Sequence, residues 1–165
     1  MAAVPFIPVP MTTYRIQLLD NQNPAQVRDA RDLLLTAFAD PLRYDTARIE
    51  AALRPAPPPF YRQFFVARQD QQVCGVAGIQ AADWATRTHL LFLSAVAPSF
   101  RHQGIGRALV EARLNWLRQH HAPGRVLVST AKPRRFKQLG FRIIAGSRKE
   151  GRWLMRLEMP AEPEA

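Results

Sequence analysis

The spacing of apolar residues in the first third of the chain predicts one strand and two helices. Within Thr12–Leu19, every second residue from Tyr14 on is apolar, which is the period of a half-buried strand. Apolar residues then recur at helical spacing as far as Phe38, and the Asn-Pro pair at 23–24 fits a helix cap and first helical residue. Asp45 is expected to cap a second, shorter helix.

Three apolar strands and a long amphipathic helix follow. The stretches Phe64–Ala67 and Val73–Ala81 flank a polar turn and predict a hairpin, while the almost wholly apolar His89–Val96 predicts a buried strand. Beyond that strand, apolar positions return at helical spacing. This pattern predicts that Trp116 lies in the core and that most arginines of the helix, including Arg113, lie away from the apolar face.

The last third of the chain completes an α/β order. We expect a strand over Arg125–Thr130, a short helix ending at Leu139, and two strands beginning at Phe141 and Trp153. The order predicts an α/β three-layer sandwich, with a mixed central sheet of about six to seven strands and helices on both faces. Residues 13–159 should form a single domain between a flexible, proline-bearing N-terminal tail, residues 1–12, and an acidic C-terminal tail, residues 160–165.

Composition narrows the class of protein. A chain of 165 residues with 47% hydrophobic residues can bury the core of one domain. The lone Cys74 cannot form an internal disulfide, which favours a reducing compartment. The N-terminus lacks the pattern of a signal peptide, and no stretch reaches the ~18 apolar residues of a membrane span. We therefore expect a cytoplasmic protein that does not enter the membrane.

The charge balance is strongly basic, with 23 Lys and Arg against 13 Asp and Glu and a formal net charge of +10. Such a charge attracts polyanions. A nucleic-acid surface would interleave basic residues with stacking aromatics, whereas the arginines here are spread over several elements, so nucleic acid is not favoured as a partner. The densest basic group fits either a solvated helix face or a contact to phosphates or an acidic acceptor. Its members are Lys132, Arg134, Arg135 and Lys137.

Residues 94–110 carry the clearest chemistry. They run from an apolar strand through a turn into the amphipathic helix without any acidic residue. A helix N-terminus presents free backbone N–H groups with a partial positive charge, and Gly104 and Gly106 leave these groups open to an anion such as phosphate. Arg101 and Arg107 add positive charge. A P-loop needs Lys-Ser or Lys-Thr after its second glycine, and a dinucleotide fingerprint needs a third glycine where Leu109 stands, so neither class fits.

This segment resembles the central motif of the GNAT superfamily of acyl-CoA-dependent N-acetyltransferases. Arg101-His102-Gln103-Gly104-Ile105-Gly106 fits the family pattern of Arg or Gln, two residues, Gly, one residue, then Gly or Ala. Phe136-Lys137-Gln138-Leu139-Gly140-Phe141, roughly thirty residues further on, is similar to the second family motif. The resemblance extends over Thr13–Met159. It implies a GNAT-like fold in which the strands ending near Val96 and beginning near Arg125 splay apart and admit the pantetheine arm of acetyl-CoA.

The resemblance implies acetyl-CoA as the acyl donor and a set of residues that bind it. In the family the turn grips the pyrophosphate, and a backbone N–H at or beside Val96 donates to the thioester carbonyl. The set comprises Ala95, Val96, Arg101, His102, Gln103, Gly104, Ile105, Gly106 and Arg107. No metal is expected.

The catalytic residues are less well defined. The family's usual acid for the leaving thiolate is a tyrosine, but the matching position is Phe136, which has no proton to give. Water, Ser129 or Thr130 could assist instead. The strand before the turn has no carboxylate, so His89 is the only titratable candidate base within it, with Asp83 in the preceding loop. A water relay, or an amine that is already partly neutral, would need no side chain.

We therefore expect an N-acetyltransferase that moves an acetyl group from acetyl-CoA to an unidentified amine by direct attack in a ternary complex. Because Phe136 cannot act as an acid, the alternative is a non-catalytic or weakly catalytic CoA-binding sensor or interaction module. A basic nucleic-acid-binding domain is a third, weaker alternative. The sequence leaves the acceptor open among a small amine, an antibiotic, a peptide and a protein, and a homodimer is the default expectation for the oligomeric state.

Overall fold

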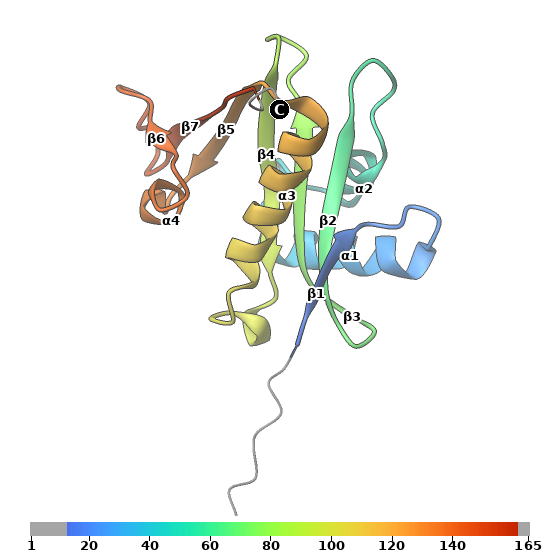
Figure 1. The fold of residues 1–165 in the computed structure, drawn as a ribbon. Helices are drawn as coiled ribbons and strands as arrows, with labels where there is room; N and C mark the ends of the chain where they lie inside the picture. The colour runs from blue at the N-terminus through green and yellow to red at the C-terminus, as the bar shows by residue number, and fades with distance from the viewer. Residues whose placement is uncertain (1–12, 162–165) are drawn as a thin grey trace, which may run out of the picture.

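The computed structural model describes residues 13–161, which build an open seven-stranded sheet with helices on both faces (Figure 1). In chain order the elements are β1 Arg15–Leu18, α1 Pro24–Ala37, α2 Thr46–Leu53, β2 Arg62–Gln69, β3 Gln72–Ala81, β4 Thr88–Val96, η1 Pro98–Phe100, α3 Ile105–His121, β5 Gly124–Thr130, α4 Pro133–Lys137, β6 Arg142–Ile143 and β7 Trp153–Met159.

The strand order in the sheet is β1-β2-β3-β4-β5-β7-β6. β4 pairs with β5 in parallel, while the other described pairs are antiparallel. The predicted mixed sheet and α/β sandwich are confirmed. The predicted N-terminal tail and the last four residues of the C-terminal tail lie outside the described residues.

Both N-cap residues predicted from the sequence make the expected hydrogen bond at the start of their helix. The side chain of Asn23 accepts the backbone N–H of Gln26 at 3.2 Å, and Pro24 is the first helical residue. The side chain of Asp45 accepts the backbone N–H of Arg48 at 2.8 Å. Each cap satisfies one of the N–H groups that a helix leaves unpaired at its start.

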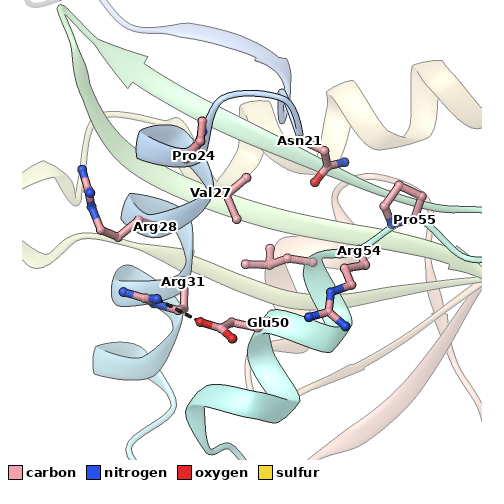
Figure 2. A pocket seen from close by; sticks show the side chains of 9 residues that line it. Asn21, Pro24, Val27, Arg28, Arg31, Glu50, Arg54 and Pro55 are labelled. Carbon is pink, nitrogen blue, oxygen red and sulfur yellow. Dashed lines mark hydrogen bonds and ion pairs between the residues drawn. The ribbon is translucent and has the colours of Figure 1, made fainter.

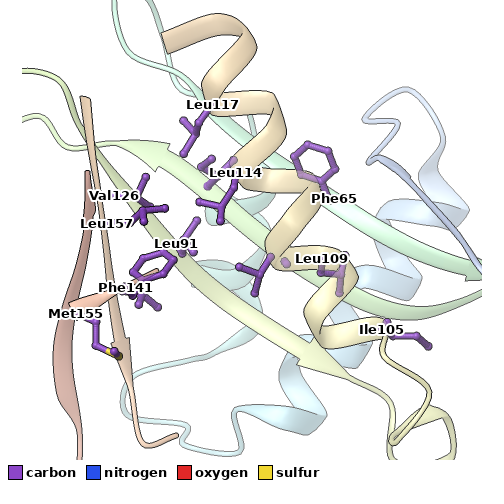
Figure 3. Packing of buried hydrophobic residues seen from close by; sticks show 14 of the residues in the cluster. Phe65, Leu91, Ile105, Leu109, Leu114, Leu117, Val126, Phe141, Met155 and Leu157 are labelled. Carbon is purple, nitrogen blue, oxygen red and sulfur yellow. The ribbon is translucent and has the colours of Figure 1, made fainter. Parts of the chain in front are cut away.

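Two apolar layers hold the helices against the sheet. On one face, α3 buries a cluster that reaches across to β5 and β7, and Figure 3 shows residues such as Leu109, Leu114, Val126 and Met155 in it. On the other face, α1 and α2 pack against β2, β3 and β4 through a second cluster. Burial of these two layers removes apolar side chains from water and so fixes the sheet between the helices.

The prediction that Arg113 lies away from the core is wrong. Arg113 is only 1% exposed and continues the buried stripe of Ile105, Leu109 and Leu117 at four-residue spacing. Its guanidinium donates to the carbonyl oxygen of Gly78 at 2.9 Å, so the buried charge has a polar partner. Burial lowers the pKa of Arg113 to about 9, which leaves it charged at neutral pH.

Trp116 lies at the edge of the core rather than inside it. Its ring is half-buried and lies 5.0 Å from the ring of Tyr61 and 4.7 Å from that of His120. The C-terminal end of α3 therefore carries an aromatic and imidazole cluster. None of the helices in the described range is both long and apolar enough to cross a bilayer.

Candidate functional site

β4 and β5 run side by side for only half of β4. Parallel pairing joins Thr88–Leu91 to Arg125–Val128, although β4 continues to Val96. β4 stays paired with β3 as far as Val96, and β5 stays paired with β7 as far as Thr130. The sheet therefore divides between the two strands, and Figure 1 shows them diverging toward the start of α3. The splay implied by the family resemblance is confirmed, and we call this opening the divide.

The free half of β4 carries a β-bulge. Between the pairs that β3 makes with Phe92 and Ala95, β4 has two residues where β3 has one, and Leu93 has a φ of +47°. The side chain of Ala95 packs on the α1 and α2 side, while that of Val96 packs on the α3 side. Because this stretch has no β5 neighbour, its backbone groups on that side face the divide. They can supply a donor to a carbonyl oxygen there.

The turn after β4 presents the N-terminus of α3 to the same opening. His102 and Gln103 are exposed in it, and α3 begins at Ile105. Gly104 is the N-cap residue, with a φ of +80° that glycine adopts without strain. No side chain caps α3, and its first turn contains no acidic residue. Within residues 13–161 these N–H groups have no side-chain acceptor, which suits the binding of an anion.

Two side chains from distant parts of the chain lie beside the glycines of this turn. A Cβ built on Gly106 would be 3.9 Å from a guanidinium nitrogen of Arg135 in α4. A Cβ built on Gly104 would be 3.6 Å from the hydroxyl oxygen of Tyr14. One member of the basic group, Arg135, therefore lies beside the α3 N-terminus, on the other side of the divide. Sequence reasoning missed Tyr14, because no local pattern links it to a turn so far along the chain.

The two arginines within the turn have partners inside the protein. Arg107 Nε donates to Glu111 Oε1 at 3.0 Å, which forms an exposed ion pair one helical turn apart. Arg101 Nε lies 3.4 Å from the carbonyl oxygen of Val96, which is a long hydrogen bond. Both contacts are exposed, so an incoming anion can compete for either guanidinium.

Position 136 brings an aromatic ring without a hydroxyl. Phe136 is half-buried against the α3-side cluster, and its ring lies edge-on to Phe141 with centroids 5.3 Å apart. It is the neighbour of Arg135 in the five-residue helix α4. α4 therefore supplies a cation near Gly106 but no proton donor at position 136.

Ser129 lies near the end of β5 on the sheet face opposite α3. Arg152 holds it twice, because Nε donates to Ser129 Oγ at 3.1 Å and a terminal guanidinium nitrogen donates to its carbonyl oxygen at 2.7 Å. Thr130 points the other way and accepts the backbone N–H of Lys132 at 3.0 Å. Ser129 and Phe136 therefore lie on different faces of the sheet.

His89 lies at the opposite end of β4 from the turn. It is 4% exposed, pairs with Val126, and is separated from Val96 by roughly 20 Å of strand. Its Nδ1 is 2.6 Å from the hydroxyl oxygen of Tyr61, and its ring centroid is 5.2 Å from that of His121. Burial, and then His121, lower the pKa of His89 to about 4. This position corrects the expectation that His89 could be the base for an amine in the divide.

Two hollows lie away from the divide. One, of about 540 Å³, is lined by His89, Asp83 and the exposed Trp84, so Asp83 is also remote from the turn. The other, of about 460 Å³, lies between α1 and α2, where Arg31 pairs with Glu50 at 2.9 Å (Figure 2). No residue of the turn or of α4 lines either hollow. Across the described range, no group of three His, Cys, Asp or Glu side chains is placed to hold a metal ion.

The glycine turn, the divide and the seven-stranded sheet define an acyl-CoA N-acyltransferase fold, and comparisons with known proteins agree. The model of the acetyltransferase (GNAT) family matches residues 27–141. The structure is similar to Escherichia coli ElaA, with a TM-score of 0.73, 13% identity, and coverage of 90% of this chain and 100% of that chain. It is also similar to the Escherichia coli ribosomal-protein-S18-alanine N-acetyltransferase, with a TM-score of 0.70, 18% identity, and coverage of 92% and 97%. An aminoglycoside 6'-N-acetyltransferase complexed with coenzyme A gives a TM-score of 0.69, 17% identity, and coverage of 91% and 99%.

The family match spans more than half of the sequence, so this chain belongs to the acetyltransferase (GNAT) family. It is an acyltransferase, and its general activity is the transfer of an acyl group from CoA to an amine. The structural neighbours, each below 25% identity, show the fold alone. No curated protein matches the sequence.

Proposed function

We propose that this protein transfers an acetyl group from acetyl-CoA to an amine by direct attack in a ternary complex. The observation that carries the proposal is the meeting of two features at one place. Parallel pairing between β4 and β5 ends, and the uncapped N-terminus of α3 lies at the mouth of the resulting divide. An anionic end of a thioester could bind at the turn while its acyl end lies between the strands.

The pyrophosphate of acetyl-CoA would lie on the turn of residues 101–107. The N–H groups of the first turn of α3 would donate to it, and Arg135 would add a fixed charge from across the divide. The hydroxyl of Tyr14 would be a further donor beside Gly104. The pantetheine arm would then follow the unpaired backbone of β4, where a donor near Val96 polarises the thioester carbonyl.

The reaction itself needs few side chains. The amine nitrogen attacks the thioester carbon, the carbon–sulfur bond breaks, the electron pair leaves on sulfur, and the new ammonium group releases its proton to solvent. Because Phe136 has no hydroxyl, the thiolate takes its proton from water. A thiol pKa near ~8.5 makes a thiolate an adequate leaving group. The geometry favours water over Ser129 for this step, because Ser129 lies on the sheet face away from α4 and is held by Arg152.

Calorimetric titration of acetyl-CoA tests the proposal. Gly106→Glu puts a carboxylate into the anion site, yet a negative charge stabilises a helix N-terminus, so the variant should stay folded. Its affinity should fall at least about 100-fold, because the carboxylate repels the pyrophosphate and fills the space it needs. Gly106→Ala is the matched control, since its Cβ would meet no atom closer than 3.9 Å. Equal affinity of the Glu variant and the parent would contradict the proposal.

The phenyl ring at position 136 favours a second candidate, a CoA-binding sensor with little or no turnover. It predicts tight acetyl-CoA binding in the calorimeter but no thiol release above background with any of a broad panel of small amines and peptides. Thiol release by the parent protein with even one amine would exclude the sensor.

A further inference from the structure

The half of the sheet beyond the divide has one face that α1 and α2 leave uncovered. In β5 and β7, alternate residues such as Val126, Val128 and Met155 pack into the α3-side cluster. The residues between them point to the other side, where α1 and α2 cover β2, β3 and β4 (Figure 1). On that side Arg125, Ser129, Arg156 and Glu158 are exposed, while Leu154 is half-buried and Leu127 is buried among them. The sheet therefore presents an open surface next to the divide.

This surface carries four arginines, and we call it the open arginine face: Arg125, Arg142, Arg152 and Arg156. Glu158 is the only acidic residue in β5, β6 and β7, and its Oε1 lies 3.2 Å from Arg156 Nε. Glu158 also stands opposite Arg125 in the β5–β7 register. One carboxylate therefore faces four guanidinium groups, and the surface has a net charge of about +3 at neutral pH.

The register places two of these charges against each other. Arg142 in β6 lies directly opposite Arg156 in β7. Like charges at directly opposite positions destabilise a sheet, so this pair is not explained by folding stability. A bound anion would offset the repulsion and gain from both guanidinium groups at once.

The open arginine face begins at the divide. Arg152 is bound to Ser129 near the free end of β5, while Arg125 is four residues back along the same strand, roughly 13 Å away. A small amine held at the divide could reach Arg152 alone. An extended polypeptide of four or five residues would pass over the whole face, with its amine at the divide and its acidic side chains over the arginines.

We propose that the acceptor is a polypeptide with Asp or Glu residues close to the amine that is acetylated, and that the open arginine face binds this acidic segment. The proposal rests on the acetyl transfer proposed above and names its substrate class. A nucleic acid fits less well, because no exposed aromatic side chain lies among the arginines for a base to stack on.

Matched peptides provide the test. Two ten-residue peptides share their N-terminal residue and differ only at positions 3 to 6, which are Asp and Glu in one and Ser and Asn in the other. With acetyl-CoA at saturation, kcat/KM should be at least about tenfold higher for the acidic peptide, and the preference should shrink as the salt concentration rises. Fluorescence anisotropy of labelled peptides in the presence of CoA should show the same order of affinities without any turnover.

The variant Arg142→Gln with Arg156→Gln removes the opposed pair. It should lower affinity for the acidic peptide about tenfold and leave affinity for the neutral peptide unchanged. Its melting temperature should stay the same or rise, because the cross-strand repulsion is gone, whereas a purely structural role would lower it. Arg118→Gln removes one exposed arginine on α3, away from this face; it is the control for loss of surface charge elsewhere and should behave like the parent.

Three results would overturn the proposal. The first is equal kcat/KM and equal affinity for the two peptides. The second is a double variant that prefers the acidic peptide as strongly as the parent does. The third is an oligothymidylate of equal charge that binds more tightly than the acidic peptide and displaces it. Calorimetry with acetyl-CoA separates this proposal from acetyl transfer itself. If acetyl-CoA binds normally and the enzyme shows no preference for the acidic peptide, only the proposed acceptor class is refuted. If acetyl-CoA does not bind, acetyl transfer itself is refuted. Peptide anisotropy then still tests whether the open arginine face binds an acidic segment.

Discussion

The two ends of β4 differ in almost every physical respect, although they belong to one nine-residue strand. At the closed end, Thr88–Leu91 lies between β3 and β5, and His89 is buried against Tyr61. At the open end, Phe92–Val96 has a neighbour on one side only, carries a bulge, and leads into an exposed turn. The closed end buries His89 with its Nδ1 at the Tyr61 hydroxyl and, within the described residues, its Nε2 without a hydrogen-bond partner, whereas the open end leaves backbone donors and acceptors facing the divide.

This difference indicates how the fold keeps an opening in a continuous sheet. The closed end joins the two halves through the pairing of Thr88–Leu91 with Arg125–Val128. The open end can then diverge without loss of the fold, because each half keeps its outer strand partners. Substitutions at the closed end should therefore change stability, and substitutions at the open end should change binding or turnover.

The largest expected effect is a loss of stability in acid that arises at the closed end. In the unfolded chain His89 titrates near pH 6.5, while in the folded protein its pKa is lowered to about 4 by burial and by His121. The unfolded state therefore binds more protons between these values, so the free energy of unfolding falls as the pH is lowered from 6.5 to 4, by about 3 kcal/mol. Urea unfolding at pH 7.5 and pH 4.5 measures it.

His89→Asn should reduce that pH dependence, because Asn keeps a partner for Tyr61 but does not titrate. Part of the dependence should remain, since burial, and then His120, also lower the pKa of His121. His102→Asn on the exposed turn at the open end is the control and should keep the parent slope. If the free energy of unfolding of the His89 variant depends on pH as strongly as that of the parent, the lowered pKa of His89 is not the cause of the acid sensitivity.

The next effect compares one substitution at the two ends. Gly124→Ala should cost about 2 kcal/mol, because its Cβ would lie 2.8 Å from the carbonyl oxygen of Arg87 and 3.2 Å from His89 Nε2. Gly106→Ala should be neutral or slightly stabilising, because its Cβ would make only ordinary contacts, none closer than 3.9 Å, and alanine favours a helix. Urea unfolding of both variants checks this, and equal losses would contradict the contrast between the ends.

Phe136→Tyr should act on turnover at the open end. It adds a hydroxyl where the family resemblance implies the thiolate acid, so kcat should rise by about tenfold, or about 1.4 kcal/mol in the barrier. Steady-state kinetics with one acceptor, together with the KM for acetyl-CoA, measure the effect. The KM should not change, and a new alkaline limb should appear in the pH profile of kcat. An unchanged kcat would show that water already protonates the thiolate without limiting the rate.

The smallest effect is expected from Tyr61→Phe. Loss of the hydroxyl 2.6 Å from His89 Nδ1 leaves a buried nitrogen without its partner, which should cost about 1 kcal/mol. The Kd for acetyl-CoA should not change, because Tyr61 lies at the closed end. Tyr44→Phe is the matched control, since the Tyr44 hydroxyl makes no hydrogen bond within the described residues. A weaker Kd in the Tyr61 variant would mean that the two ends are coupled.

Local signals in the sequence were sufficient to predict the strands and helices and the glycine turn before α3. Asn23 and Asp45 cap the helices that they were expected to cap, and Gly104 has the positive φ that explains its place before α3. Arg113 was misplaced because periodicity treats every arginine as exposed, whereas this one is buried with its charge on a strand carbonyl. His89 was named as a candidate base because it is the only titratable candidate within its strand, but it lies at the end of that strand far from the turn.

The sequence by itself determined the order of strands and helices, the glycine turn before α3, and the phenyl ring where the family resemblance implies a tyrosine. Each of these depends on residues that are neighbours along the chain or share a short motif. Only the tertiary structure decided where the pairing of β4 and β5 ends, that Tyr14 and Arg135 lie beside the turn, and that four arginines share an uncovered face. Those features depend on packing between elements that are far apart in the sequence, and no local pattern encodes that packing.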